Sequence, residues 1–188
     1  MFSGSYRPQD VCFLLKPIDL APIANLEEKE CLIQTGQRHY SEMISPESLP
    51  DTRYISLFHN AVDANGERMA HDCLQLASFI AADIAGEVAL VSLARAGTPV
   101  GVIVKHLLEQ VFDRTCTHYS VSIIRDRGID FEALDFIRRR HIDQTIVFVD
   151  GWTGKGVISR ELKQSIAAYN LSRGATVSPA LYVLSDLC

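Results

Sequence analysis

The sequence predicts an α/β fold, a parallel sheet flanked by helices on both faces, with an irregular N-terminal appendage. From residue 86 onward, short apolar runs rich in β-branched residues alternate with stretches whose apolar residues recur at helical spacing. Each crossover of this length must return the chain to the same sheet, which places the strands in parallel. We therefore assign residues 61–188 to the α/β core and residues 1–60 to the appendage.

The expected elements follow this alternation. The strands are short apolar runs, at residues 87–93, 119–124, 145–149 and 180–184. The helices have one apolar stripe each, at residues 26–37, 67–84, 99–111, 130–137 and 157–170. Asp130 is suited to cap its helix, and Arg138, Arg139 and Arg140 suit the last turn of the same helix. Five prolines divide the first 60 residues into short pieces.

Composition narrows the function classes. The 188 residues are 47% hydrophobic with a net charge of -5, which suits a folded protein and disfavours a nucleic-acid partner. The cysteines at 12, 31, 73, 116 and 188 lack zinc spacing and indicate no disulfide framework, so a reducing cytoplasm is expected. No apolar run is long enough for a membrane span. The chain ends just after a predicted strand, which leaves open that the natural protein continues.

The turn after residues 145–149 is the strongest candidate for a binding site. It contains an acid, a hydroxyl, a cation and three glycines: Asp150, Gly151, Trp152, Thr153, Gly154, Lys155 and Gly156. Glycines permit close backbone approach, and amides at the start of the next helix face an incoming anion. The spacing does not match a P-loop. The alternative is a tight turn in which the glycines only relieve strain.

The turn after residues 87–93 carries a second candidate. Arg95, Ala96 and Gly97 form a short loop of small residues with one cation, and Arg95 is placed to face a second anionic group. An ordinary solvated turn explains the same residues equally well. Ligands of open parallel sheets bind beyond the carboxyl ends of the strands, so the two turns are expected at one edge.

These two turns resemble those of the type I phosphoribosyltransferases. Asp150 and segment 153–156 resemble that family's motif for phosphoribosyl pyrophosphate (PRPP), and segment 95–97 resembles its pyrophosphate loop. The closer resemblance covers nearly the whole chain. Segments 92–101, 122–125, 128–130 and 149–156, with 13–16 and 39–43, are similar to the phosphoribosyltransferase-like proteins encoded with tellurite-resistance genes, the StiP family, some of which carry a cysteine-protease label.

The resemblance implies a transferase that binds PRPP with Mg²⁺ and a nucleobase-like acceptor. Asp150 would hold the ribose and touch the metal, and Arg95, Ala96 and Gly97 would face pyrophosphate. The substrate-binding set would be completed by Gly151, Thr153, Gly154, Lys155 and Gly156. Arg125 is the second expected catalytic residue, on a mobile loop that closes over pyrophosphate. A homodimer is left open.

Two departures from the family's PRPP motif leave alternative functions open. Gly151 stands where the motif usually has a second acid, and Gly156 stands where a threonine is common. Losing a carboxylate reduces the means to organise Mg²⁺, so a module that binds PRPP or a nucleotide without turnover is the first alternative. The second is a cysteine protease, on the family label alone, because none of the cysteines lies in a recognisable nucleophile setting.

Overall fold

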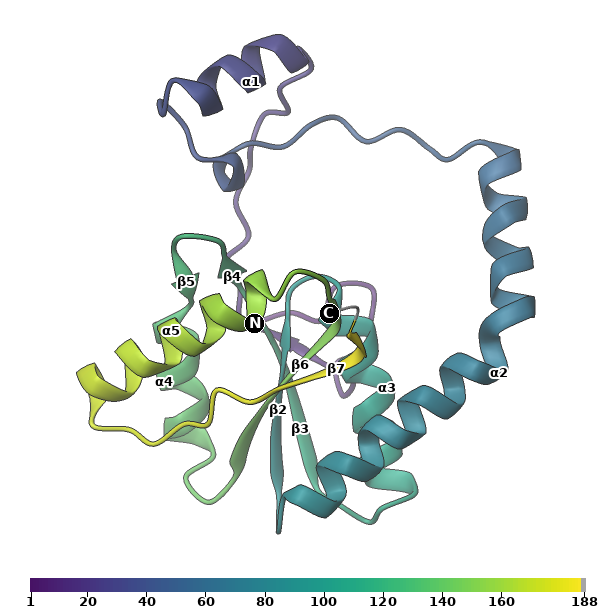
Figure 1. Cartoon of the computed structure of the whole chain (residues 1–188), viewed down its shortest axis with the longest axis vertical. Coiled ribbons are helices and arrows are strands. Elements are labelled where there is room, and N and C mark those ends of the chain that lie inside the picture. Colours follow the sequence, from purple (N-terminus) through teal and green to yellow (C-terminus); the bar gives the residue numbers. More distant parts are fainter. Residues whose placement is uncertain (187–188) are drawn as a thin grey trace. The chain divides into compact units, whose positions relative to one another are not determined.

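A computed structural model describes residues 1–186 of the chain (Figure 1). By contacts the chain divides into two compact units, one of residues 1–15 and 67–188 and the other of residues 16–66. Residues 12–13, which fall in the stretch expected as an appendage, pair with the main sheet as strand β1. Helix α2 (Thr52–Asp83) contributes residues to both units.

The centre of the larger unit is a five-stranded, all-parallel sheet in the order β1-β3-β2-β6-β7. Its strands are β1 (Cys12–Phe13), β2 (Val88–Leu93), β3 (Cys116–Val121), β6 (Thr145–Thr153) and β7 (Leu181–Asp186). A separate antiparallel hairpin consists of β4 (Ile123–Ile124) and β5 (Gly128–Ile129). Every residue of β2 is buried, as expected of a central parallel strand covered on both faces.

Helices cover both faces of this sheet, which confirms the predicted α/β class (Figure 1). The helices of this unit besides α2 are α3 (Gly97–Gln110), α4 (Phe131–Arg140) and α5 (Val157–Arg173). One core joins α4 and α5 to the sheet through Leu134 and Ile166. The other joins α3 and residues 67–83 of α2 to the opposite face through Val104 and Ile80.

The smaller unit contains helix α1 (Leu26–Gln34) and a 3-10 turn, η1 (Tyr40–Glu42). The Asn25 side chain accepts hydrogen bonds from the amides of Glu27 and Glu28 and so caps α1. The helix ends three residues before the predicted end. Gly36, with φ of 68°, adopts the left-handed conformation that terminates helices.

Helix α2 begins 15 residues earlier than the predicted helix at residue 67. The Asp51 side chain accepts a hydrogen bond of 2.6 Å from the Tyr54 amide and starts the helix after Pro50. Residues 52–70 are exposed throughout, so the buried stripe that guided the prediction does not extend to them. Among residues 1–186, no helix combines the length and the hydropathy that a membrane crossing requires.

Candidate functional site

The two predicted turns meet at the carboxyl end of the sheet. A Cβ built at Gly97 would lie 2.7 Å from the Val149 carbonyl oxygen and 3.2 Å from Oδ1 of Asp150. A Cβ at Gly151 would lie 3.3 Å from the carbonyl oxygen of Ala96. Strands β2 and β6 are neighbours in the sheet, which brings the two turns together. The turns approach this closely because glycine occupies positions 97 and 151. The exposed Arg95 lies on the same turn, after a cis Ala94–Arg95 peptide.

Asp150 is buried within the end of β6. Its Oδ1 accepts a 2.7 Å hydrogen bond from the amide of Gly151. Burial raises the pKa of the Asp150 carboxyl, and this hydrogen bond opposes the shift. The carboxylate therefore carries a desolvation cost in the folded protein.

The predicted turn at 150–156 is shorter than expected, because β6 continues to Thr153. Asp150, Trp152 and Thr153 pair with β7, and the Thr153 hydroxyl donates a 3.0 Å hydrogen bond to Asp186. Sequence reasoning ended the strand at Val149 because glycine and aspartate are poor strand formers, but pairing with a neighbouring strand overrides that preference.

The remaining turn consists of Gly154, Lys155 and Gly156. Gly156 is left-handed, with φ of 66°, and α5 begins after it with neither an acidic residue nor a side-chain cap in its first turn. The exposed Lys155 accepts a 3.2 Å hydrogen bond from Arg160 through its carbonyl oxygen. The backbone N–H groups in the first turn of α5 therefore donate no hydrogen bond to a side chain of the N-cap residue.

Arg125 lies at the exposed tip of the β4–β5 hairpin. This hairpin packs on α5. The Asp126 amide donates to Glu161 at 3.1 Å, and the Ile129 amide donates to Oγ of Ser165 at 3.3 Å. The segment expected to be a mobile loop is thus a paired hairpin held by two hydrogen bonds.

The described residues contain no group of three or more His, Cys, Asp or Glu side chains able to hold a metal ion. Asp150 is the acid at the end of β6, and Gly151 follows it. A metal there would draw its other ligands from water or substrate oxygens, as Mg²⁺ commonly does. The Mg²⁺ expectation stays a prediction.

The cysteines within residues 1–186 are free thiols in unlike settings. Cys73 and Cys116 are buried, and burial raises the pKa of Cys116 to about 12. Cys31 is exposed on α1. Cys188 lies outside the described residues.

Cys12 is half-buried and lines a cavity of about 370 Å³ together with Tyr119 and Arg140. Cys12 is the register partner of Tyr119 in β3, and the Tyr119 hydroxyl is 2.6 Å from Nε2 of His141. Burial raises the pKa of Cys12, while the N-terminal amine and Arg140 lower it. This cluster escaped the sequence analysis because β1 is only two residues long. The short apolar run at 11–15 is the signal that could have indicated a strand.

His118 is a second feature that sequence reasoning missed. Its imidazole is buried in β3, with Nε2 2.9 Å from Oγ of Ser92 and Nδ1 2.9 Å from the carbonyl oxygen of Asp10. Burial lowers its pKa to about 4. Both ring nitrogens are satisfied inside the core, so His118 links β3 to β2 and to the segment just before β1 rather than facing a ligand.

Two comparisons with known proteins agree. Residues 4–188 match a family model described as "Tellurite-like stress resistance cysteine protease StiP". A protein of Acinetobacter baylyi named "Cysteine protease StiP" is 46% identical over 186 residues, which cover 99% of this chain and 48% of that protein. The chain therefore spans about half the length of this curated relative.

The comparisons correct the expected function. Both names describe a cysteine protease, so the expectation of a phosphoribosyltransferase that turns over PRPP is wrong. A PRPP-binding module without turnover is not what these names describe either. The error arose because glycine-rich turns at the end of a parallel sheet indicate where a ligand can bind, and not which reaction follows. The similarity to the tellurite-resistance proteins is confirmed, and the chain belongs to the StiP family.

Proposed function

We propose that this protein hydrolyses peptide bonds with a cysteine thiolate and that Cys12 is the nucleophile. Membership of a family named for cysteine proteases supports the reaction class. The cluster of Cys12, Tyr119, Arg140 and His141 supports the choice of thiol, because it combines partial exposure with a cation and an imidazole. The buried Cys116, with a pKa of about 12, is unsuited to attack.

The chemistry assigns a role to each member of the cluster. His141 takes the proton of the Cys12 thiol, and the thiolate attacks the scissile carbonyl carbon. His141 returns the proton to the nitrogen as the C–N bond breaks and the amine leaves, and water then hydrolyses the thioester to release the acid and restore the thiol. Arg140 favours the thiolate, against the effect of burial. Burial lowers the pKa of His141, so its imidazole is neutral at pH 7 and able to accept a proton. Tyr119 orients His141 through their hydrogen bond.

The test measures hydrolysis of a fluorogenic casein by the full-length protein under reducing conditions. We expect Cys12→Ala to abolish hydrolysis while Cys31→Ala, an exposed control, leaves it unchanged. Tyr119→Phe keeps the ring, removes the hydroxyl and should lower kcat while shifting its pH profile. Full activity of Cys12→Ala would refute the assignment, and activity lost only in Cys188→Ala would move the nucleophile to that position.

A finer fold assignment also belongs to this proposal: the α/β unit has the type I phosphoribosyltransferase-like fold. The five parallel strands flanked by helices support it, as does the contact between the turns at Gly97 and Asp150. An experimental structure superposed on solved type I phosphoribosyltransferases tests it. A different strand order would contradict it.

We also propose that some of the predicted substrate-binding residues bind an anion. The turn at 95–97 and the start of α5 after Gly156 are where we place the anion, because the first turn of α5 carries neither an acidic residue nor a side-chain cap. Titration of the protein with inorganic phosphate, with and without Mg²⁺, tests this binding. Amide shifts at 95–97 and 154–156 that saturate would support it, and their absence would refute it.

A further inference from the structure

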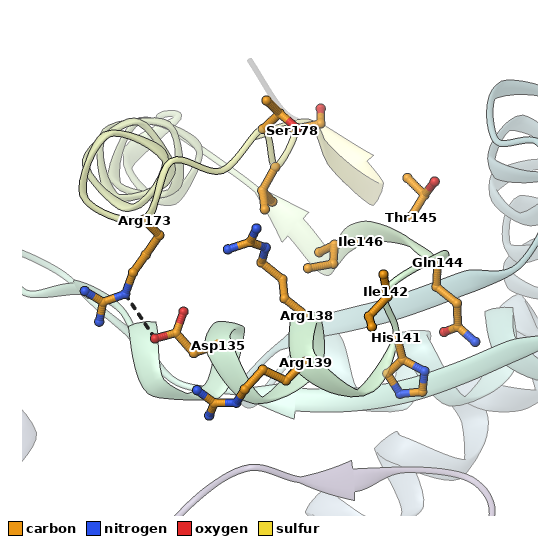
Figure 2. A pocket seen from close by; sticks show the side chains of 12 residues that line it. Asp135, Arg138, Arg139, His141, Ile142, Gln144, Thr145, Ile146, Arg173 and Ser178 are labelled. Atoms are coloured by element: carbon orange, nitrogen blue, oxygen red, sulfur yellow. Dashed lines mark hydrogen bonds and ion pairs between the residues drawn. The ribbon is translucent and has the colours of Figure 1, made fainter.

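We propose that a cavity at the other end of the sheet, near the start of β6, binds a small organic dianion. The cavity lies between the end of α4, the start of β6 and the segment after α5 (Figure 2). Its volume of about 840 Å³ falls within the range of small-molecule sites. Its polar lining includes Asp135, Arg138, Arg139, Gln144, Arg173 and Ser178.

The lining is positive in a chain whose net charge is -5. Asp135 is already engaged, because it accepts hydrogen bonds from the Tyr169 hydroxyl at 2.7 Å and from Nε of Arg173 at 3.0 Å. Arg173 therefore balances Asp135. The half-buried Arg138 and the exposed Arg139 remain as net positive charge in the lining, which favours an anionic ligand.

Arg138 is placed to anchor an oxyanion. Its side chain projects among the lining residues, between Arg173 and Ile146 (Figure 2). Its Nη1 donates to the Tyr169 hydroxyl at 3.4 Å, and its Cζ lies 5.8 Å from the centre of the Tyr169 ring. These contacts restrict the guanidinium while other N–H groups of its fork are available for bidentate hydrogen bonds to a carboxylate or phosphate.

The helix dipole alone does not account for this arrangement. A cation in the last turn of α4 interacts favourably with the helix dipole, whichever way its side chain points. The exposed Arg139 and Arg140 already supply this interaction. Arg138 is half-buried and held against an aromatic ring. Holding a guanidinium in this way costs side-chain entropy, which a bound anion would offset.

The Gln144 side chain belongs to the wall of the cavity. Its Oε1 is buried and has no hydrogen-bond partner among the described residues, while its Nε2 donates to Glu87 at 2.8 Å. Gln144 lines the cavity, but its amide points away from Arg138, so it is not assigned a contact with the ligand (Figure 2).

The apolar lining limits what else the ligand carries. Ile142, Ile146 and Val177 line the cavity beside the polar groups. The Ser178 hydroxyl accepts a 3.3 Å hydrogen bond from the Ala180 amide and still has a proton to donate to an oxyanion. A compact dianion with a short carbon skeleton fits these groups better than inorganic phosphate, which has no apolar part.

The experiment titrates the full-length protein with O-phosphoserine and with inorganic phosphate at constant ionic strength, followed by calorimetry and NMR. We expect phosphoserine to shift residues 138–146 and 173–178 saturably and to bind more tightly than phosphate. Arg138→Gln should weaken phosphoserine binding about tenfold or more. Arg53→Gln, which removes an exposed arginine on α2, is the matched control and should change nothing.

If Arg138→Gln does not fold by circular dichroism, Arg139→Gln at the exposed position should still weaken binding. Shifts confined to residues 95–97 and 154–156, no saturable shift, or unchanged affinity of the folded arginine variants would overturn the proposal. Loss of proteolysis in Cys12→Ala bears on the proposed function alone.

Discussion

Gly97 and Asp150 touch across the carboxyl ends of β2 and β6. A Cβ at position 97 would come within 3.2 Å of Oδ1 of Asp150, and within 2.7 Å of the Val149 carbonyl oxygen on the rigid backbone of β6. The main chain of a central strand cannot move aside as a flexible side chain can. The missing side chain at Gly97 therefore lets the two turns meet.

Gly97→Ala should destabilise the protein by about 1–3 kcal/mol, because the added methyl group overpacks the junction of the two turns. Urea denaturation followed by circular dichroism measures the loss. Gly86→Ala is not a suitable control, because the φ of 88° there strains any side chain. Gly66→Ala, in an exposed stretch of α2 with no atom within 4 Å, should stabilise slightly. Equal stability of Gly97→Ala and the parent protein would contradict the close approach.

His118 should make stability fall between about pH 6.5 and pH 4. Burial lowers its folded pKa to about 4 from the usual 6.5, so acid protonates the unfolded state first and favours unfolding. The loss is about 3 kcal/mol at full extent. His118→Gln removes the titration, and its stability should depend less on pH in this window. Urea midpoints across the window measure the difference, and parallel curves for the two proteins would argue against a buried neutral imidazole.

Asp150→Asn should leave the protein at least as stable as the parent at pH 7. Burial raises the folded pKa of Asp150 above its unfolded value, so the carboxylate lowers stability as pH rises through that range. Asparagine keeps an Oδ1 that can accept from the Gly151 amide without carrying the charge. Thermal unfolding at pH 7 and at pH 3.5 tests this, with any advantage of the variant shrinking in acid. A clear loss of stability at pH 7 would contradict it.

Asp51→Ala should shorten helix α2 at its start. The Asp51 side chain accepts from the Tyr54 amide, and loss of such a cap costs about 1 kcal/mol. Hydrogen exchange should become faster at the amides of residues 53–56, whereas residues 73–80, packed on the sheet, keep their protection. Asp51→Asn retains an acceptor and serves as the control. Unchanged exchange at 53–56 in Asp51→Ala would show that the cap does not hold the helix start.

Much of the fold could be predicted because its signals are local. Asp130 accepts from the Ala133 amide at 3.1 Å and caps α4 as predicted, and α5 ends at Gly174 in the left-handed conformation typical of helix ends. The buried strand β2 is a run of apolar residues that no loop would carry. The two-residue β1 and the first half of α2 were missed, because neither presents a buried periodic pattern of useful length.

The sequence by itself determined the α/β class, the cap of α4 and the position of the glycine turns, because each depends on residues close together in the chain. Tertiary structure decided that Asp150 continues a strand, that Cys12 lies opposite Tyr119, and that Arg138 and Gln144 line one cavity. Those outcomes depend on which strands become neighbours, and that is set by burial of both sheet faces at once. The glycine turns beside Asp150 indicated a place for a ligand, whereas the chemistry had to be inferred from side chains that only folding brings together.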